Sequence, residues 1–175
     1  MPFRYYPPKR RSQPQETGNL FGSQPSRSSE TQAPEKHLVA HVDGGARGNP
    51  GPAGFGVFIQ DSQKHPLAEI SEYLGMQTNN FAEYSALLAA LRYAREHGYN
   101  ALEVVSDSEL MVRQMNGIYK VKNEGLKPLY EQARKISREL DWFKVRHVRR
   151  EFNKDADRLA NEAMDKKHHV VRQLS

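Results

Sequence analysis

Two aspartates follow apolar runs that are typical of buried β-strands. Asp43 comes directly after residues 38–42 and precedes two glycines, and Asp107 closes the run 101–106. A carboxylate at the inner end of a central strand is costly unless it is paired, hydrogen-bonded or metal-bound. The glycines after Asp43 would also let backbone or a ligand approach closely. These two positions are therefore candidates for an acidic site at one end of a sheet.

Two further acids, Glu83 and Asp157, fall where the pattern predicts the first turn of a helix. Each of the four acids has an ordinary structural explanation. Asp43 could be a turn residue, the helix acids could complement the helix dipole, and Asp107 could cap the following helix. The coincidence favours function, because two strand ends and two helix starts can direct side chains to one place.

Four carboxylates in one place would repel one another unless a hard cation lay among them. Mg²⁺ is the natural candidate, because it takes oxygen ligands and keeps waters or substrate phosphates in its shell. Such a site suits phosphoryl chemistry with two metal ions ~3.5–4 Å apart.

The elements that must position these acids follow from hydrophobic periodicity and turn signals. The element order is β-β-β-α-β-α-α-β-α, which predicts an α/β fold with a five-stranded mixed sheet flanked by helices. The strands are expected at 37–45, 54–62, 66–76, 101–107 and 142–148. The helices are expected from Asn79 or Asn80 to Gly98, from Ser108 to Gly117, from Leu126 to Leu140, and onward from Asn153 as N-cap.

The composition divides the chain into three parts. Residues 1–36 hold six of the ten prolines and few apolar side chains, so we expect a disordered, basic tail rich in Pro, Ser and Gln. Residues 37–167 form the expected domain, and 168–175 a short, frayed C-terminal tail. The chain has no cysteine, which excludes disulfides, thiolate metal sites and a cysteine nucleophile.

The charge balance points to a polar, basic protein. Lys and Arg number 26 against 21 Asp and Glu, and the sequence pI is about 9.4. Neither a secretory signal nor an apolar run of the ~20 residues needed to cross a membrane is evident, so a cytoplasmic location is expected. We also expect a monomer, which no sequence feature decides. The basic run 9–11 is either a nucleic-acid-binding arm or solvated charge. The patch 18–22 resembles peptides that bind the bacterial sliding clamp, a replication partner.

Four blocks of sequence together resemble type 1 ribonuclease H. They read VDGGARGNPGPAGFGV, TNNFAEYSALLAAL, VVSDSELMVRQMNG and HVRREFNKDADRLANEA, in family order, and span nearly all of residues 37–165. The resemblance implies the ribonuclease H-like fold and metal-dependent endonucleolytic cleavage of the RNA strand of RNA–DNA hybrids, giving 5′-phosphate and 3′-hydroxyl ends. It is closest to the compact members, because only residues 117–125 occupy the place of the basic protrusion of the longer form.

The resemblance also implies roles for individual residues. Asp43 would bind both Mg²⁺ ions, Glu83 and Asp107 one of them, and Asp157 the other, with Mn²⁺ as a possible substitute. Arg150, or alternatively His147, would assist product release. The residues that match the family's substrate contacts are Gly44, Gly45, Asn49, Thr78, Asn79, Asn80 and Asn153.

Other functions fit the sequence less well. The chain has no nucleophile elbow of the form GxSxG, and its glycine-rich turn lacks the Lys-Ser/Thr end of a phosphate-binding Walker loop. A non-cleaving module that binds hybrids or RNA, and another polynucleotidyl transferase or exonuclease of the same fold, remain the alternatives. A binder would gain from losing negative charge near phosphates, and these acids are present.

Overall fold

Alternating apolar residues build a meander of three long antiparallel strands at the start of the domain. The computed structural model describes residues 31–174. Strand β1 spans Leu38–Ala46, β2 Gly51–Asp61 and β3 Pro66–Gln77. In β1, Leu38, Ala40 and Val42 are buried on one face of the sheet. This strand ends in the acidic residue and glycines that the sequence marks as a candidate site.

The second half of the domain adds parallel strands and four helices. Strands β4 (Ala101–Ser106) and β5 (Trp142–His147) continue the sheet beside β1, each parallel to its neighbour. The helices are α1 (Asn79–Glu96), α2 (Glu109–Met115), α3 (Lys127–Glu139) and α4 (Lys154–Lys166), with a 3₁₀ turn, η1, at Arg150–Phe152. The predicted element order is confirmed up to α4.

The sheet has six strands rather than the expected five. Residues His169–Gln173 form β6, which pairs antiparallel with β3, and the strand order is β5-β4-β1-β2-β3-β6. The expected C-terminal tail is therefore largely a strand. The segment is too short and polar for its sequence alone to predict a strand. In the structure it pairs with the open edge of β3, and Arg172 pairs with Glu69 and Glu162.

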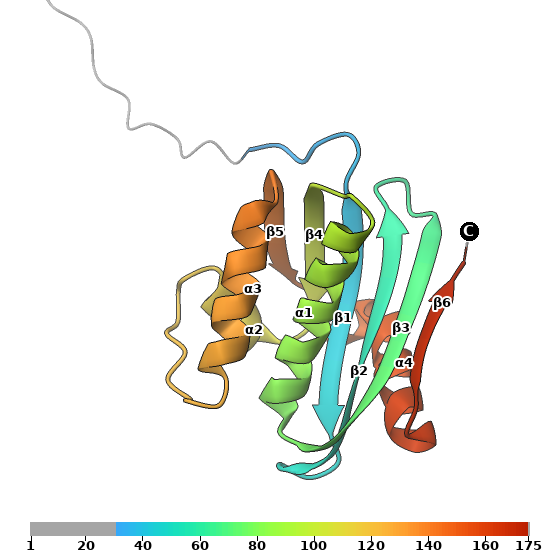
Figure 1. Ribbon diagram of the computed structural model, residues 1–175, viewed down its shortest axis with the longest axis vertical. Coiled ribbons are helices and arrows are strands. Elements are labelled where there is room, and N and C mark those ends of the chain that lie inside the picture. Colours follow the sequence, from blue (N-terminus) through green and yellow to red (C-terminus); the bar gives the residue numbers. More distant parts are fainter. Residues whose placement is uncertain (1–30, 175) are drawn as a thin grey trace, which may run out of the picture. The chain divides into compact units, whose positions relative to one another are not determined.

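Helices cover both faces of the sheet. In Figure 1, α1 and α3 lie in front of it and α4 lies behind. The core is on the α1 side, where Leu87 and Leu91 of that helix meet the buried face of β1. Apolar residues at helical spacing thus hold α1 across the sheet, with its first residues beside the end of β1.

The expected N-terminal tail, 1–36, lies mostly outside the described residues. Residues Ala33–Ser175 form one unit, and the Ser62 hydroxyl donates to the Glu35 carbonyl (2.8 Å), which ties the segment before β1 to the β2–β3 turn. Within residues 31–174, no helix has the length and apolar character needed to span a bilayer.

Candidate active site

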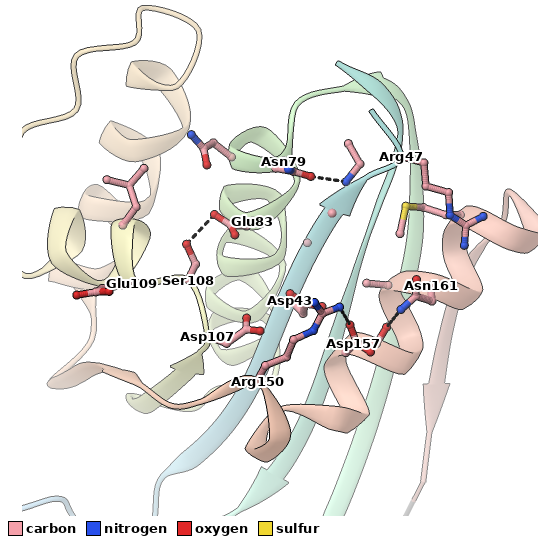
Figure 2. Close-up of a pocket in the computed structure, with 17 residues that line it drawn as sticks. Asp43, Arg47, Asn79, Glu83, Asp107, Ser108, Glu109, Arg150, Asp157 and Asn161 are labelled. Atoms are coloured by element: carbon pink, nitrogen blue, oxygen red, sulfur yellow. Dashed lines mark hydrogen bonds and ion pairs between the residues drawn. The ribbon is translucent and has the colours of Figure 1, made fainter. Parts of the chain in front are cut away.

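The register of the parallel strands brings Asp43 and Asp107 to the same edge of the sheet. Val42 of β1 and Ser106 of β4 are the last residues that pair with each other. Asp43 and Asp107 directly follow them in the sequence. Both carboxylates therefore leave neighbouring strands at the same level, as Figure 2 shows. The sequence-based expectation of a shared strand edge is met.

Glu83 reaches this edge because α1 packs unusually close to β1. A Cβ on Gly44 would lie 2.2 Å from the Ala82 carbonyl carbon and 2.4 Å from the Glu83 nitrogen. The glycine therefore admits the backbone of the helix, which is one of the two close approaches expected from the sequence. Glu83 is the fifth residue of α1 and lies outside the first turn, so the helix-dipole explanation for this acid does not apply.

A serine that the sequence analysis did not assign holds the Glu83 carboxylate. The Ser108 hydroxyl donates to Glu83 Oε2 (2.7 Å) and accepts from the Met111 amide as the N-cap of α2. The cap is therefore Ser108 and not Asp107. In the sequence, a serine directly before a short helix indicates an N-cap, but it does not indicate that the hydroxyl also binds Glu83.

Asp157 enters the site from the opposite face of the sheet, on the first turn of α4. Its Oδ1 accepts from Arg150 Nη2 (3.1 Å), and its backbone carbonyl accepts from Asn161 Nδ2 (2.9 Å) (Figure 2). Arg150 comes from η1, between β5 and α4. His147, the alternative helper, is an exposed residue of β5 that does not line the pocket.

All four carboxylates line one pocket of about 590 Å³. It opens between the ends of β1 and β4 and the starts of α1, α2 and α4. Residues in its lining that the sequence analysis did not assign are Ala46, Arg47, Ser108, Glu109, Leu110, Ala160, Asn161 and Met164.

The neighbouring negative charges affect the pKa of the Asp43 carboxyl. Burial raises the pKa of this carboxyl to about 8, and the charge of Asp107 is the next cause. The charges of Asp157 and Glu83 raise this pKa further, whereas Arg150 opposes the rise. A strand-end carboxyl held beside three other acids is a group that a cation would stabilise.

Glu83 has a similar but smaller perturbation. Burial raises its pKa to about 7, the hydrogen bond from Ser108 opposes this, and the charge of Asp107 adds to it. Both acids thus titrate far above the usual carboxyl range, which is characteristic of functional sites.

The donor chemistry of the pocket fits a hard divalent cation. Within the described range 31–174, no three acidic or histidine side chains are arranged to hold a metal ion by themselves. This agrees with the present partners, because Glu83 is engaged by Ser108 and Asp157 by Arg150. Mg²⁺ is usually bound by one or two carboxylates together with waters and substrate phosphates. The residues therefore fit divalent ions that also take ligands from the substrate.

The predicted substrate contacts divide into three groups. Gly45, Asn79 and Asn80 line the pocket together with Gly44. Asn49 and Thr78 lie behind them: Asn49 Oδ1 accepts from the Asn79 amide (3.2 Å), and Thr78 Oγ1 caps α1 by accepting from the Phe81 amide (3.2 Å). Asn79 Oδ1 in turn accepts from the Ala46 amide (2.6 Å), so the β1–β2 turn and the start of α1 are held together.

Asn153 is the exception among the predicted substrate contacts. Its side chain is only 1% exposed, donates to the Val42 carbonyl (2.9 Å) and does not line the pocket. It stands at the N-cap position of α4, as predicted, but its side chain makes no capping hydrogen bond. The substrate contact stays a prediction, and in this structure the side chain turns inward to β1.

Comparison with known proteins decides the family. A family model described as reverse transcriptase-like matches residues 41–163. Ribonuclease HI of the archaeon Halobacterium salinarum is 39% identical over 126 residues, which are 72% of this chain and 63% of that protein. The chain belongs to the type 1 ribonuclease H family, and to its compact form.

Solved structures of ribonuclease H agree with the fold. The crystal structure of the Halobacterium enzyme has a TM-score of 0.72 at 38% identity and covers 74% of this chain and 98% of that one. LC11-RNase H1 in complex with an RNA/DNA hybrid has a TM-score of 0.71 at 46% identity, covering 74% and 98%.

A longer relative matches the same region. A bifunctional protein of Mycobacterium tuberculosis is 43% identical over 129 residues, 73% of this chain. This chain spans only about a third (35%) of the length of that relative.

Proposed function

We propose that this chain is an endonuclease that hydrolyses the RNA strand of RNA–DNA hybrids and leaves 5′-phosphate and 3′-hydroxyl ends. The observation that carries the proposal is the meeting of Asp43, Glu83, Asp107 and Asp157 in one pocket, where burial and mutual repulsion raise the pKa of Asp43. The similarity to a ribonuclease H1 solved with an RNA/DNA hybrid supports the choice of substrate.

The carboxylates would hold two divalent ions, with Mg²⁺ as the proposed metal and Mn²⁺ as the alternative. Asp43 would contact both, Glu83 and Asp107 one, and Asp157 the other. When bound, such ions supply an activated water and charge stabilisation at the leaving 3′ oxygen. The hydrogen bond from Ser108 orients the Glu83 carboxylate before metal arrives, which reduces the reorganisation required.

The remaining residues of the pocket would position the substrate. Asn79 and Asn80, at the start of α1, offer amide groups and a helix N-terminus to a phosphate and the minor groove. Gly45 would lie close to the RNA strand, where 2′-hydroxyls distinguish RNA from DNA. Arg150, whose guanidinium pairs with Asp157, would exchange this partner for a substrate phosphate.

A three-substrate assay tests the proposal. The protein is incubated with an RNA–DNA hybrid, duplex DNA and double-stranded RNA, each with Mg²⁺ and with EDTA. We expect Mg²⁺-dependent cleavage of the RNA strand of the hybrid, and Asp43→Asn should lower its rate by roughly three orders of magnitude or more because the metal ligands are incomplete. Binding without cleavage, cleavage of duplex DNA alone, or a near wild-type rate for Asp43→Asn would reject it.

A further inference from the structure

Asn153 hydrogen-bonds to backbone atoms at two of the four acids: its side chain bonds beside Asp43, and its own carbonyl bonds to Asp157. Its Nδ2 donates to the carbonyl of Val42 (2.9 Å), the residue directly before Asp43. Its own carbonyl accepts from the amide of Asp157 (3.1 Å). One residue thus joins the end of β1 to the first turn of α4, across 111 positions of sequence.

The cost of placing an asparagine here indicates a specific role. The Val42 carbonyl can only accept, so the Nδ2 of Asn153 must face it. The Oδ1 is then buried without a hydrogen bond in close geometry among the described residues, with the His41 side chain as its interaction partner. A buried amide oxygen without a close donor is unfavourable. An asparagine that caps its helix would avoid this cost, but this side chain makes no capping bond.

We infer that Asn153 is a positioning residue that fixes Asp157 relative to Asp43. Asp43 and Asp157 stand on different elements, and among the described residues Asn153 hydrogen-bonds both to α4 and to the backbone beside Asp43. A donor to the Val42 carbonyl keeps the start of α4 in register with the end of β1. This inference rests on the proposed function, because the separation of the two carboxylates matters only if both bind the same ions and phosphate.

Ser71, a residue of β3 that hydrogen-bonds to the same helix, offers a matched control. Its hydroxyl is equally buried, at 1% exposed, and donates to the Leu159 carbonyl (2.8 Å), which ties α4 to β3. Both side chains therefore hydrogen-bond between α4 and the sheet, and the Ser71 hydroxyl also lies 3.0 Å from His168 Nε2. Neither side chain lines the pocket, but Ser71 ties α4 to β3 and not to the strand that carries Asp43. Removing either bond should lower the melting temperature by a similar amount.

The experiment compares Asn153→Ala, Asn153→Asp and Ser71→Ala in steady-state cleavage of a hybrid and in thermal unfolding. Asn153→Asp keeps the size of the side chain and replaces the amide donor with a carboxyl group, and the melting temperature of each variant shows that it is folded before its kcat is compared. We expect both Asn153 variants to lower kcat by about 10- to 100-fold with KM within about twofold, the size of effect that a small misplacement of reacting groups produces. Ser71→Ala should keep kcat within about twofold.

The outcomes separate this role from the alternatives. A raised KM at unchanged kcat would overturn the inference and favour a substrate contact. Equal losses of kcat in the Asn153 and Ser71 variants would overturn it by showing a purely structural role. If the proposed function itself fails, the unaltered protein does not cleave the hybrid, which is a different result from both.

Discussion

Asp43 and Gly56 lie directly opposite each other in the β1–β2 pair. A Cβ on Gly56 would lie 2.4 Å from the Ala156 carbonyl oxygen and 2.6 Å from the Ala160 nitrogen, so α4 rests on the bare backbone of β2. The missing side chain opposite Asp43 therefore lets the helix that carries Asp157 approach. On the other face, Gly44 gives α1 and Glu83 the same access.

We expect Gly56→Ala to impair both folding and catalysis. The new methyl group must displace backbone of α4, which costs about 1–3 kcal/mol as overpacking and moves Asp157 away from Asp43. Thermal unfolding and hybrid cleavage measure the two effects. Gly45→Ala is the control for stability, because its Cβ would meet only the end of the Met164 side chain, at 3.7 Å. Equal melting temperatures for the two variants would contradict this packing.

The stability of the metal-free protein should fall from about pH 5 to about pH 8. The pKa of Asp43 is raised to about 8 and that of Glu83 to about 7, so the folded protein holds these protons more tightly than the unfolded chain does. Their contribution is complete below the usual carboxyl range and is lost as the pH rises through 7 and 8.

Thermal unfolding in EDTA across this pH range provides the measurement. Asp43→Asn should flatten the dependence, and Mg²⁺ should reduce it by stabilising the ionised carboxylates. Below about pH 4 the trend should reverse, because hydrogen bonds from Arg172 and then Lys166 lower the pKa of Glu162 to about 2. A melting temperature in EDTA that rises steadily from about pH 5 to about pH 8 would argue against the crowded site.

Replacing Arg150 should lower the steady-state turnover rate more than the rate of the chemical step. Its guanidinium is exposed except for its contact with Asp157 (3.1 Å), and it can exchange this partner for a phosphate. We expect Arg150→Ala to lower the steady-state kcat by about tenfold while the single-turnover rate changes by less than about threefold. Arg149→Ala and His147→Ala are controls, since neither residue lines the pocket. Equal losses in both kinetic regimes would assign Arg150 to the chemical step.

Removing the last strand should destabilise the domain without abolishing the site. Truncation after Lys167 exposes the edge of β3 and removes Arg172, whose partners Glu69 and Glu162 are largely covered. We expect the melting temperature to fall by roughly 5–10 °C. Arg172→Ala should produce part of this loss. Hybrid cleavage at 25 °C should persist, because no residue of β6 lines the pocket. An unchanged melting temperature would show that β6 adds nothing to the fold.

The sequence by itself determined the element order and the identity of the four acids. Apolar periodicity predicts β1, α1, β4 and α4, and the acids stand at fixed positions along these elements. The pattern places Asp43 and Asp107 each at the end of an apolar run, and the parallel pairing of β1 with β4 brings those two ends to one edge of the sheet. The element order and the positions of the acids are encoded locally, in the period of the side chains and the residues that interrupt it.

Tertiary structure decided which partner each polar group finds. The inward turn of Asn153, the hydrogen bond from Ser108 to Glu83 and the pairing of β6 with β3 all join residues far apart in the chain. None of them changes the local pattern of hydrophobicity. The first two depend on how closely α1 and α4 pack on the glycines of β1 and β2, and the third depends on the free edge of β3. Each is a property of the assembled layers rather than of any single segment.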